Sequence, residues 1–397
     1  MYFKIRNFLS HLSLKKFPKK IDILYFDYVD KNLSKIIIKN RNFDYIFSDK
    51  KRELNFFLIL LIFINFNSLK ILFFENFTTA YAYIYILFSR SKIVLTTGDN
   101  NLNFYRLKNY HKNIKFVAIQ NGSRHRINDI FDFDHINNFN KEKKICSDLI
   151  LTFNNSISKL FEKYFCSKTI SIGKFINNSI RVFDHHIYTN KVIYISQFRE
   201  RNFKSLHFKS HGKKVCSIKQ FYEVERKLMP ILNKYCSKNR LELVIMGNEK
   251  SKNARNKEKK FYNLHIGNSA WKYWNRDGNL NERYKFISRF SIIICSWSTL
   301  GVEMFSRNCK VAFFRPRNVP PYNDRTFGWP ANFPNKGFWY TSFITQPEVD
   351  RVLNNLLNIK KNDWIAKINL VKNKIMKFDA NNTILRDQLD SMLNYET

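Results

Sequence analysis

The chain has 397 residues, of which 44% are hydrophobic and 25% are charged, and 68 basic against 32 acidic residues give a formal net charge of +36. This composition excludes a disordered polymer, and the length predicts two domains of moderate size. The charge makes nucleic acid or an anionic membrane a candidate partner. Because Lys, Asn, Ile and Phe are abundant throughout while only 10 residues are Gly, we interpret much of the charge as compositional. We still expect it to favour a phosphate-bearing substrate and an anionic membrane surface.

Six cysteines are spread along the chain without a CxxC pair, so neither a zinc site nor a disulfide framework is indicated and a reducing cytoplasm fits. The basic N-terminus is not followed by the continuous apolar region of a secretory signal. Residues 54–66 (LNFFLILLIFINF) resemble a membrane segment, but about 13 residues are fewer than the roughly 20 that span a bilayer. We interpret the segment as a buried helix, with contact to one face of a membrane as the second interpretation. The expected location is the cytoplasm, with peripheral contact at the inner face of the membrane left open.

Apolar runs in the first half of the chain recur at the spacing of strands that alternate with helices, which predicts a parallel sheet with crossover helices. The expected strands are residues 21–29, 43–47, 69–74, 93–97, 116–120, 149–153 and 169–172. Residues 78–88 and 156–165 are among the expected helices. The polar residues 177–190 then predict a linker between domains.

The second half of the chain repeats this alternation. The expected strands are residues 192–196, 241–246, 292–294 and 311–314, and the expected helices are 220–235, which Pro230 would kink, and the amphipathic 347–376. Residues 262–266 show no clear pattern. We therefore predict an α/β protein with two Rossmann-like domains facing a cleft, 1–180 and 191–345, and a closing C-terminal helical segment, 346–397, that packs back across both.

Residues 291–303 (SIIICSWSTLGVE) form the most informative segment of the chain. A β-branched run predicts a buried parallel strand that ends in a hydroxyl-rich turn, and a helical pattern follows from Leu300. Ser298 or Thr299 is the expected N-cap. Such a turn places unpaired N–H groups and a positive dipole end at the mouth of a sheet, where phosphates bind. Glu303, about one turn into the helix, could accept hydrogen bonds from sugar or ribose hydroxyls, although most such turns in α/β proteins bind nothing.

Two loops after expected strands of the first domain carry polar groups. Asp99 follows the 93–97 strand, where it could act as general base toward an acceptor hydroxyl or simply form an Asx-type turn. The 116–120 strand ends in NGSRHR, in which Gly122 suits a tight turn and the basic side chains could meet anionic groups. His125 is a rival for the base, although an exposed loop histidine without function is the default interpretation.

Arginines follow two expected strands of the second domain. Arg199 comes after the 192–196 strand and could reach a phosphate. Arg315 and Arg317 come after the 311–314 strand, where they would make a pyrophosphate clamp, although paired arginines on a basic protein are often solvated surface. The aromatic residues of 325–330 and 337–340 could stack on a base or sugar, and packing is the simpler interpretation.

The chain contains no GxGxxG, Walker A, HExxH or GxSxG motif, which argues against a dinucleotide oxidoreductase, a P-loop NTPase, a zinc hydrolase and an α/β-hydrolase. Four of its segments instead resemble bacterial surface-carbohydrate, or O-antigen, biosynthesis proteins. They are 97–124 (TGDNNLNFYRLKNYHKNIKFVAIQNGSR), 192–200 (VIYISQFRE), 295–317 (CSWSTLGVEMFSRNCKVAFFRPR) and 325–330 (RTFGWP). The resemblance implies a glycosyltransferase-B-like fold and transferase activity, with Ser298, Thr299 and Glu303 at the donor site.

The chain departs from related polymer transferases at one position of this resemblance. Those proteins, including the glycerol-phosphate type, often carry a His before the Gly of the QNG-like loop, where it can act as base. Asn121 stands there in this chain and cannot abstract a proton. The base would then be Asp99 or His125, or the loop would only position the substrate.

We therefore predict a membrane-associated glycosyltransferase of surface-polysaccharide (O-antigen, lipopolysaccharide) assembly, which moves a sugar from a nucleotide-activated donor to a lipid-linked or oligosaccharide acceptor without a metal or other cofactor. The expected site comprises catalytic Asp99 or His125, donor-binding Ser296, Ser298, Thr299, Gly301, Glu303, Arg199 and Arg315, and acceptor-side Asn100, Asn101, Gln120, Asn121, Gly122 and Arg124. The alternatives are a CDP-polyol phosphotransferase, a nucleotide-sugar epimerase on the same scaffold and, in a different class, a basic nucleic-acid-binding protein. The last predicts salt-sensitive binding and is the weakest, because the chain has no nucleic-acid-binding motif.

Overall fold

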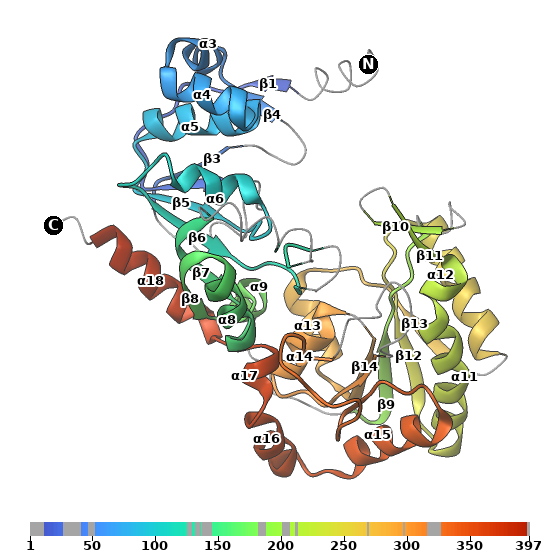
Figure 1. Cartoon of the computed structure of the whole chain (residues 1–397). Helices are drawn as coiled ribbons and strands as arrows, with labels where there is room; N and C mark the ends of the chain where they lie inside the picture. Colours follow the sequence, from blue (N-terminus) through green and yellow to red (C-terminus); the bar gives the residue numbers. More distant parts are fainter. Residues whose placement is uncertain are drawn as a thin grey trace. The chain divides into compact units, whose positions relative to one another are not determined.

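The structure, a computed structural model, describes residues 12–26, 41–46, 52–124, 129–131, 136, 145–181, 188–200, 207–210, 213–267, 270–296, 298–315 and 327–394. Its contacts divide the chain into two units (Figure 1). Unit 1 consists of Met1–Gly122, Asp134–Ser179 and Asn381–Thr397, and unit 2 consists of Ser123–Phe133 and Ile180–Ala380. The C-terminal segment is therefore shared, since its residues up to Ala380 cluster with unit 2 and the rest cluster with unit 1.

Unit 1 is built on a six-stranded sheet in which all neighbouring strands are parallel. The strand order is β3 (Phe43–Ile46), β2 (Ile23–Phe26), β5 (Ile93–Thr96), β6 (Lys115–Ile119), β7 (Cys146–Thr152) and β8 (Cys166–Ser171). A separate parallel pair is formed by β1 (Leu12–Leu14) and β4 (Arg52–Leu54). Every residue of β2 and β5 is buried, which explains why these strands are nearly unbroken apolar runs in the sequence.

The helices of unit 1 come from both ends of the chain. They are α3 (Phe56–Ile64), α4 (Phe66–Phe74), α5 (Phe77–Ser89), α6 (Leu102–Lys108), α8 (Asn155–Tyr164), α9 (Phe175–Ser179) and α18 (Thr383–Asn394). Leu385, Leu389 and Leu393 of α18 belong to the same hydrophobic core as the strands β2, β5, β6 and β7. The closing C-terminal helix is thus present, and it completes the core of unit 1.

Asparagine, abundant in this chain, occupies the N-cap position of many helices in unit 1. Asn55, Asn65, Asn76, Asn101 and Asn154 precede α3, α4, α5, α6 and α8, and each side chain accepts a backbone N–H of the first helical turn. Asn is among the best N-cap residues because its short side-chain oxygen reaches an otherwise unpaired N–H. The compositional excess of Asn therefore fixes where these helices begin.

Residues 69–74 were expected to form a strand, and that prediction is wrong because they lie in α4. A short apolar run does not by itself distinguish a buried strand from a helix. The side chain of Asn65 caps α4, and the buried residues of the helix are Ser68 and Ile71, which are three apart and so lie on one face. The Asn65 cap and the spacing of the buried residues explain why this segment forms a helix.

Residues 54–66 do not form a buried helix either. Within α3 only Leu58 and Ile62, one turn apart, are buried, while Ile59 and Leu61 are half-buried and the other residues of the helix are exposed. Among the described residues no single helix is long and apolar enough to cross a membrane. The pair α3 and α4 reaches that length and composition only together, and the two helices are bent by 92° relative to each other.

Unit 2 contains a second six-stranded, fully parallel sheet. The strand order is β13 (Trp271–Trp274), β12 (Glu242–Met246), β9 (Tyr188–Ile195), β14 (Phe290–Cys295), β15 (Val311–Phe314) and β16 (Tyr340–Thr341). An antiparallel hairpin, β10 (His207–Ser210) and β11 (Lys213–Ser217), is separate from it. Two parallel sheets, each with its helices, confirm the predicted α/β class with two Rossmann-like units.

The helices of unit 2 differ in detail from those expected. They are α10 (Ile218–Phe221), α11 (Glu223–Lys238), α12 (Lys252–Ile266), α13 (Leu280–Ile287), α14 (Thr299–Ser306), α15 (Gln346–Asn358), α16 (Lys361–Asn369) and α17 (Lys372–Ile375). The expected helix 220–235 is two helices that part at Tyr222. The expected helix 347–376 is three, which part at the extended residues Ile359 and Lys360 and again at Leu370 and Val371. Pro230 lies inside α11.

The aromatic residues after β15 pack within unit 2. The rings of Phe327 and Tyr340 are stacked with centroids 4.3 Å apart, and Trp339 packs against Phe305 and Trp364. All of these side chains are buried. The packing interpretation is confirmed for them, while residues 316–326 lie outside the described part of the chain.

Candidate functional site

The carboxyl ends of the strands in unit 2 meet at one edge of the sheet because all the strands are parallel. The backbone register pairs the last residues of β9, β12 and β13 with one another. The segments that follow these strands carry Arg199, Asn248 and Arg276, while β14 and β15 lead to Ser296 and Arg315. Ligands of open α/β sheets bind at this edge, where loops from several strands converge.

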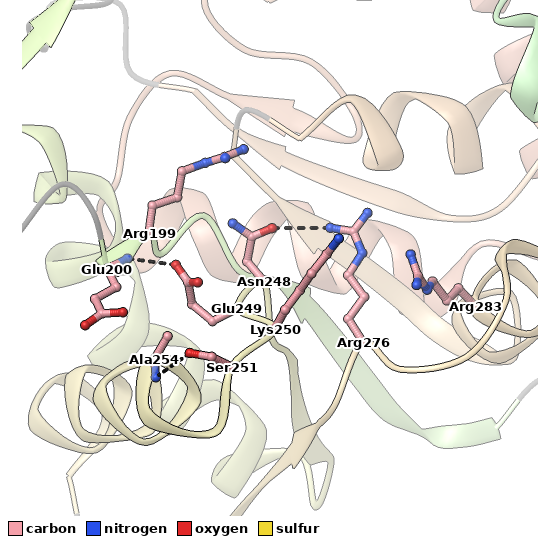
Figure 2. A pocket seen from close by; sticks show the side chains of 9 residues that line it. All are labelled: Arg199, Glu200, Asn248, Glu249, Lys250, Ser251, Ala254, Arg276 and Arg283. Atoms are coloured by element: carbon pink, nitrogen blue, oxygen red, sulfur yellow. Dashed lines mark hydrogen bonds between the residues drawn. The ribbon is translucent and has the colours of Figure 1, made fainter. Parts of the chain in front are cut away.

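A pocket of about 640 Å³ opens at this edge and is rich in arginine (Figure 2). It is lined by Arg199, Glu200, Asn248, Glu249, Lys250, Ser251, Ala254, Arg276 and Arg283. One of its acids, Glu249, is engaged locally, since it accepts the backbone N–H of Glu200 at 2.7 Å. The other, Glu200, forms an ion pair with Lys257. The arginines and the exposed Lys250 are therefore the charges that the pocket can offer to a ligand.

Arg276 and Arg283 are half-buried, whereas Arg199 is exposed. Nη1 of Arg276 donates to Oδ1 of Asn248 at 3.3 Å, and among the described residues its Nε has no hydrogen-bond partner. Burial lowers the pKa of Arg276, and the nearby charge of Arg283 lowers it further, with a smaller contribution from Arg199 and an opposing one from Glu303. The Nε of Arg283 is likewise buried without a partner in this part of the chain. Clustered guanidinium groups with unused donors are suited to bind an anion with several oxygens, such as a diphosphate.

Glu258 of α12 holds the floor of the pocket in place. Its carboxylate is fully buried and accepts hydrogen bonds from Tyr273 Oη at 2.6 Å and from the backbone N–H of Asn248 at 2.9 Å. It also accepts from Oγ of Ser196 and from the backbone N–H of Glu249. One carboxylate thus ties the segments that follow β9 and β12 to strand β13 itself, and it holds the backbone of Asn248 at the pocket.

Glu303 lies deeper than the sequence predicts. Its side chain is 3% exposed and its Oε2 accepts a hydrogen bond from the hydroxyl of Tyr284 on α13. Burial raises the pKa of Tyr284 well above its usual value, and the Glu303 carboxylate raises it further. The negative charge of Glu303 also acts on Arg276 and Arg307. Glu303 therefore supports the arginines electrostatically, and a direct contact with a sugar or ribose stays a prediction.

The N-terminus of α14 follows β14 as the sequence predicts. Ser298 occupies the N-cap position, but its side chain makes no capping hydrogen bond. Oγ1 of Thr299 lies 3.5 Å from Oγ of Ser123, whose segment also belongs to unit 2. The helix N-terminus thus presents hydroxyl groups and no side-chain cap, which fits the expected anion site. Binding of phosphate by Ser298 and Thr299 stays a prediction.

Gly301 has a packing role that the sequence analysis did not foresee. A Cβ at this position would lie 2.2 Å from Sγ of Cys295, so α14 can approach the end of β14 only because residue 301 lacks a side chain. Gly301 is itself buried. This close packing is a structural role for Gly301, and its expected role in donor binding stays a prediction.

Ser296 and Arg315 serve the scaffold of this edge. The Ser296 side chain is fully buried and lies beside Tyr194, and its carbonyl accepts a hydrogen bond from Nε of Arg315 at 2.6 Å. The Arg315 guanidinium also lies over the rings of Phe313 and Phe327. Arg315 thus bridges the ends of β14 and β15, and Arg317, its expected partner in a clamp, lies outside the described residues.

The expected acceptor-side residues of unit 1 lie after β5 and β6. Asp99 is 1% exposed; its Oδ1 accepts the backbone N–H of Asn121 at 3.3 Å, and its carbonyl accepts the hydroxyl of Tyr105 at 2.8 Å. Asn100 is exposed, whereas the Asn101 side chain caps α6. The structure thus brings Asp99 and Asn121 together. Asn101 acts as a helix cap, as the alternative interpretation of this segment predicts.

Gln120 and Arg124 both have partners within the described part of the chain. Gln120 is buried, donates from Nε2 to the carbonyl of Gly122 at 2.8 Å and accepts the backbone N–H of Phe153 at 2.7 Å. Arg124 forms a buried ion pair with Asp129 at 2.7 Å. These contacts shape the loop, and binding roles for its side chains stay predictions. His125, the rival base, lies outside the described residues.

The sequence analysis found one lining residue of the arginine pocket as a ligand candidate, Arg199, and missed Arg276 and Arg283. The cause is β13, whose sequence WKYW was not recognised as a strand. Alternating aromatic residues are typical of strands, so this run followed by Asn275 and Arg276 was the available signal.

A comparison with protein families identifies the chain over residues 117–393, which match a family described as "putative O-antigen biosynthesis protein". The chain belongs to this family. The match covers most of the chain, including the strand-end edge of unit 2 and the loop after β6 in unit 1, and it places the protein in O-antigen biosynthesis. No curated protein matches the chain by sequence.

Solved structures show the same fold at low sequence identity. The Staphylococcus aureus MnaA–UDP structure is 12% identical with a TM-score of 0.54, over 94% of this chain and 97% of that one. The wall teichoic acid polymerase TagF is 12% identical with a TM-score of 0.50, over 94% and 89%. The fold of this O-antigen biosynthesis protein is therefore one that a UDP-bound protein and a wall teichoic acid polymerase also adopt.

Proposed function

We propose that this protein is a glycosyltransferase that moves a sugar from a nucleoside-diphosphate donor to a lipid-linked or oligosaccharide acceptor in surface-polysaccharide assembly. The observation that carries the proposal is the arginine pocket at the carboxyl edge of the unit 2 sheet. Family membership supports the biosynthetic context, and a protein of the same fold has been solved with UDP.

The charges of the pocket suit a diphosphate. Arg276 and Arg283 have unused Nε donors, and Arg199 is exposed at the same pocket. A bound diphosphate would relieve the mutual repulsion of the guanidinium groups and satisfy their donors at the same time. The hydroxyls at the N-terminus of α14 and its dipole would add to this stabilisation.

In the reaction, the bond between the anomeric carbon of the sugar and the diphosphate oxygen breaks, and a bond to the acceptor oxygen forms. The acceptor hydroxyl loses its proton to a base, and the nucleoside diphosphate leaves with both electrons of the broken bond. Fixed arginines lower the barrier because they stabilise the charge that develops on the leaving diphosphate. In this proposal arginines supply that stabilisation in place of a metal ion.

Asp99 is the base in this proposal, with His125 as the alternative that the sequence leaves open. Its carboxylate is held by the backbone of Asn121, which orients it, and a local opening of that loop would expose it to an acceptor. A cytoplasmic location at the inner face of the membrane would give the protein both a nucleotide donor and a lipid-linked acceptor.

The test is calorimetric titration of the purified protein with UDP, GDP, CDP, ADP and dTDP, followed by the matching nucleotide sugars. Arg276→Gln and Arg283→Gln should each weaken binding of the preferred nucleotide by about tenfold or more, because each removes a charge-assisted hydrogen bond. Arg289→Gln is the matched control, since Arg289 precedes β14 and so lies at the opposite edge of the same sheet. Equal losses in the control would remove the pocket from the donor site.

Turnover then separates the proposed activity from its alternatives. Transfer should require an acceptor and release a nucleoside diphosphate. Conversion of a nucleotide sugar without any acceptor would make the protein an epimerase, and release of CMP from a CDP-polyol would make it a phosphotransferase. Tight, salt-sensitive RNA binding without nucleotide affinity would support the nucleic-acid-binding alternative.

A further inference from the structure

The outer side of α3 and α4 in unit 1 exposes a continuous series of large apolar side chains. Phe56, Ile64, Phe66, Phe73 and Phe74 are between 65% and 80% exposed. The neighbouring Phe57, Leu60 and Phe63 are about half exposed, and the end of α5 adds Leu87 and Phe88. Soluble proteins rarely expose an apolar patch of this extent unless it contacts a partner or a membrane. We call this the α3–α4 patch.

The α3–α4 patch is stably supported from beneath. α3, α4 and α5 pack against one another (Figure 1). Most residues of α5 are buried. Residues 56–74 contain a single charged residue, Lys70, which is exposed, and no acid. The patch is therefore neither a solvated helix face nor an unfolded segment, but a rigid apolar surface with a positive charge.

A basic loop borders the patch and is joined to it by Phe17. The Phe17 ring packs on Phe57 of α3 and Phe88 of α5, with centroids 5.8 Å and 5.2 Å apart. On either side of Phe17 the loop exposes Lys16, Lys19 and Lys20.

The same lysines line a pocket of about 550 Å³, whose two acids are engaged within the protein. Asp44 pairs with Lys15 at 2.9 Å and accepts the hydroxyl of Tyr85 at 2.5 Å, and Glu53 accepts the hydroxyl of Tyr45 at 3.2 Å. The exposed ammonium groups are thus the charges that the rim of the patch presents to a partner.

We propose that the α3–α4 patch docks on an anionic phospholipid bilayer, with its phenylalanines among the acyl chains and the lysines of residues 16–20 on the lipid phosphates. Apolar side chains beside basic ones are the composition of surfaces that lie in the membrane interface. The 92° bend between α3 and α4 broadens the surface that enters the interface. This inference concerns unit 1 alone and does not depend on the proposed transferase activity.

Charge decides between a bilayer and a second copy of the chain. A symmetric dimer through the patch would bring two sets of lysines to one contact, in a chain of net charge +36. An anionic bilayer instead offers a complementary charge next to an apolar interior. The observations therefore favour the lipid surface.

The experiment is co-sedimentation of the full-length protein, without nucleotide, with vesicles of phosphatidylcholine alone or mixed with phosphatidylglycerol. The wild type should bind the mixed vesicles and bind the neutral ones at least about tenfold more weakly. The double variant Phe66→Ser/Phe73→Ser should lose about tenfold or more in partitioning. Leu264→Ser/Leu370→Ser is the matched control, because these two side chains of unit 2 are 79% and 80% exposed and lie off the patch.

The lysines are tested in the same way. Lys19→Gln/Lys20→Gln should weaken binding to the mixed vesicles about fivefold for each lysine, while Lys238→Gln/Lys260→Gln, exposed positions on α11 and α12, should leave it unchanged. All variants alter exposed side chains, and an unchanged melting temperature confirms that they fold. Three results would each overturn the proposal. The protein could bind both kinds of vesicle equally, or the control variants could lose as much binding as the patch variants. The third is a dimer that only the phenylalanine variant dissociates.

Discussion

Replacing Arg276 with methionine should separate the stability of the protein from its affinity for nucleotides. Burial and the neighbouring Arg283 disfavour the charge of Arg276, and within the described residues its hydrogen bonding is limited to Asn248. Methionine keeps much of the length of the side chain without the charge. Replacing a buried charge by an apolar group of similar volume is often neutral or stabilising. We therefore expect the free Arg276→Met protein to be at least as stable as the wild type.

Nucleotide affinity should change in the opposite direction. A charge-assisted hydrogen bond contributes about 1.5–3 kcal/mol, so the loss of one from Arg276 to a diphosphate weakens binding roughly 10- to 150-fold. The thermal stabilisation that a saturating nucleoside diphosphate gives to the wild type should shrink accordingly. Thermal unfolding with and without nucleotide, together with titration calorimetry, measures both effects on the same sample.

One result would refute this reasoning. If Arg276→Met lowered the melting temperature of the free protein by more than about 4 °C, or roughly 1–2 kcal/mol, and left nucleotide affinity unchanged, Arg276 would be a structural residue. The matched control is Arg289→Met at the opposite edge of the sheet, which should alter neither quantity.

Two substitutions in unit 2 and one test of the proposed reaction give further predictions. Gly301→Ala should lower the free energy of unfolding, measured in urea, by about 1–3 kcal/mol, because the added Cβ would lie 2.2 Å from Sγ of Cys295. Adding Cys295→Ala to the same chain should restore part of that stability. An unchanged stability of Gly301→Ala would contradict the close approach of helix and strand. Burial raises the pKa of Glu225 to about 7 from 4.5, so the stability from its bound proton is complete below pH 4.5 and is lost as the pH rises through 7. Glu225→Gln should therefore raise the melting temperature at pH 8 and change it little at pH 5, and equal effects at both values would argue against this pKa. If arginines replace a metal in the proposed reaction, EDTA should leave the rate of transfer unchanged, and a loss that Mg²⁺ restores would show otherwise.

The sequence was sufficient to predict the fold class, because parallel strands buried on both faces produce apolar runs that alternate with helices. It failed for residues 69–74, where the decisive information was the cap at Asn65 and not the apolar run itself. It also failed for 54–66, since the periodicity of Leu58 and Ile62 indicates one buried face but not whether another element covers the opposite face.

The sequence predicted where the turn of the candidate site lies along the chain, but not the contacts that its charged side chains make. The turn at Ser298 and Thr299 follows from local pattern, and the structure places it at the expected edge of the sheet. The inward direction of Glu303 depends on Tyr284, which comes from a helix nineteen positions earlier in the chain. Pairwise contacts of that kind leave no periodic signal, and neither does the meeting of Arg276 with Asn248, which depends on the order of the strands.

The contribution of α18 to the core of unit 1 has a consequence for how the protein is made. The strands of unit 1 emerge early from the ribosome, but their core is completed only by Leu385, Leu389 and Leu393, which come after the last residue of unit 2 in the chain. At about 5–20 residues per second, the roughly 200 residues between α9 and α18 take about 10–40 s to synthesise. During this interval part of the apolar surface of the nascent first unit stays uncovered. A chaperone that binds nascent chains would then be needed longest for the part of the protein that is synthesised first.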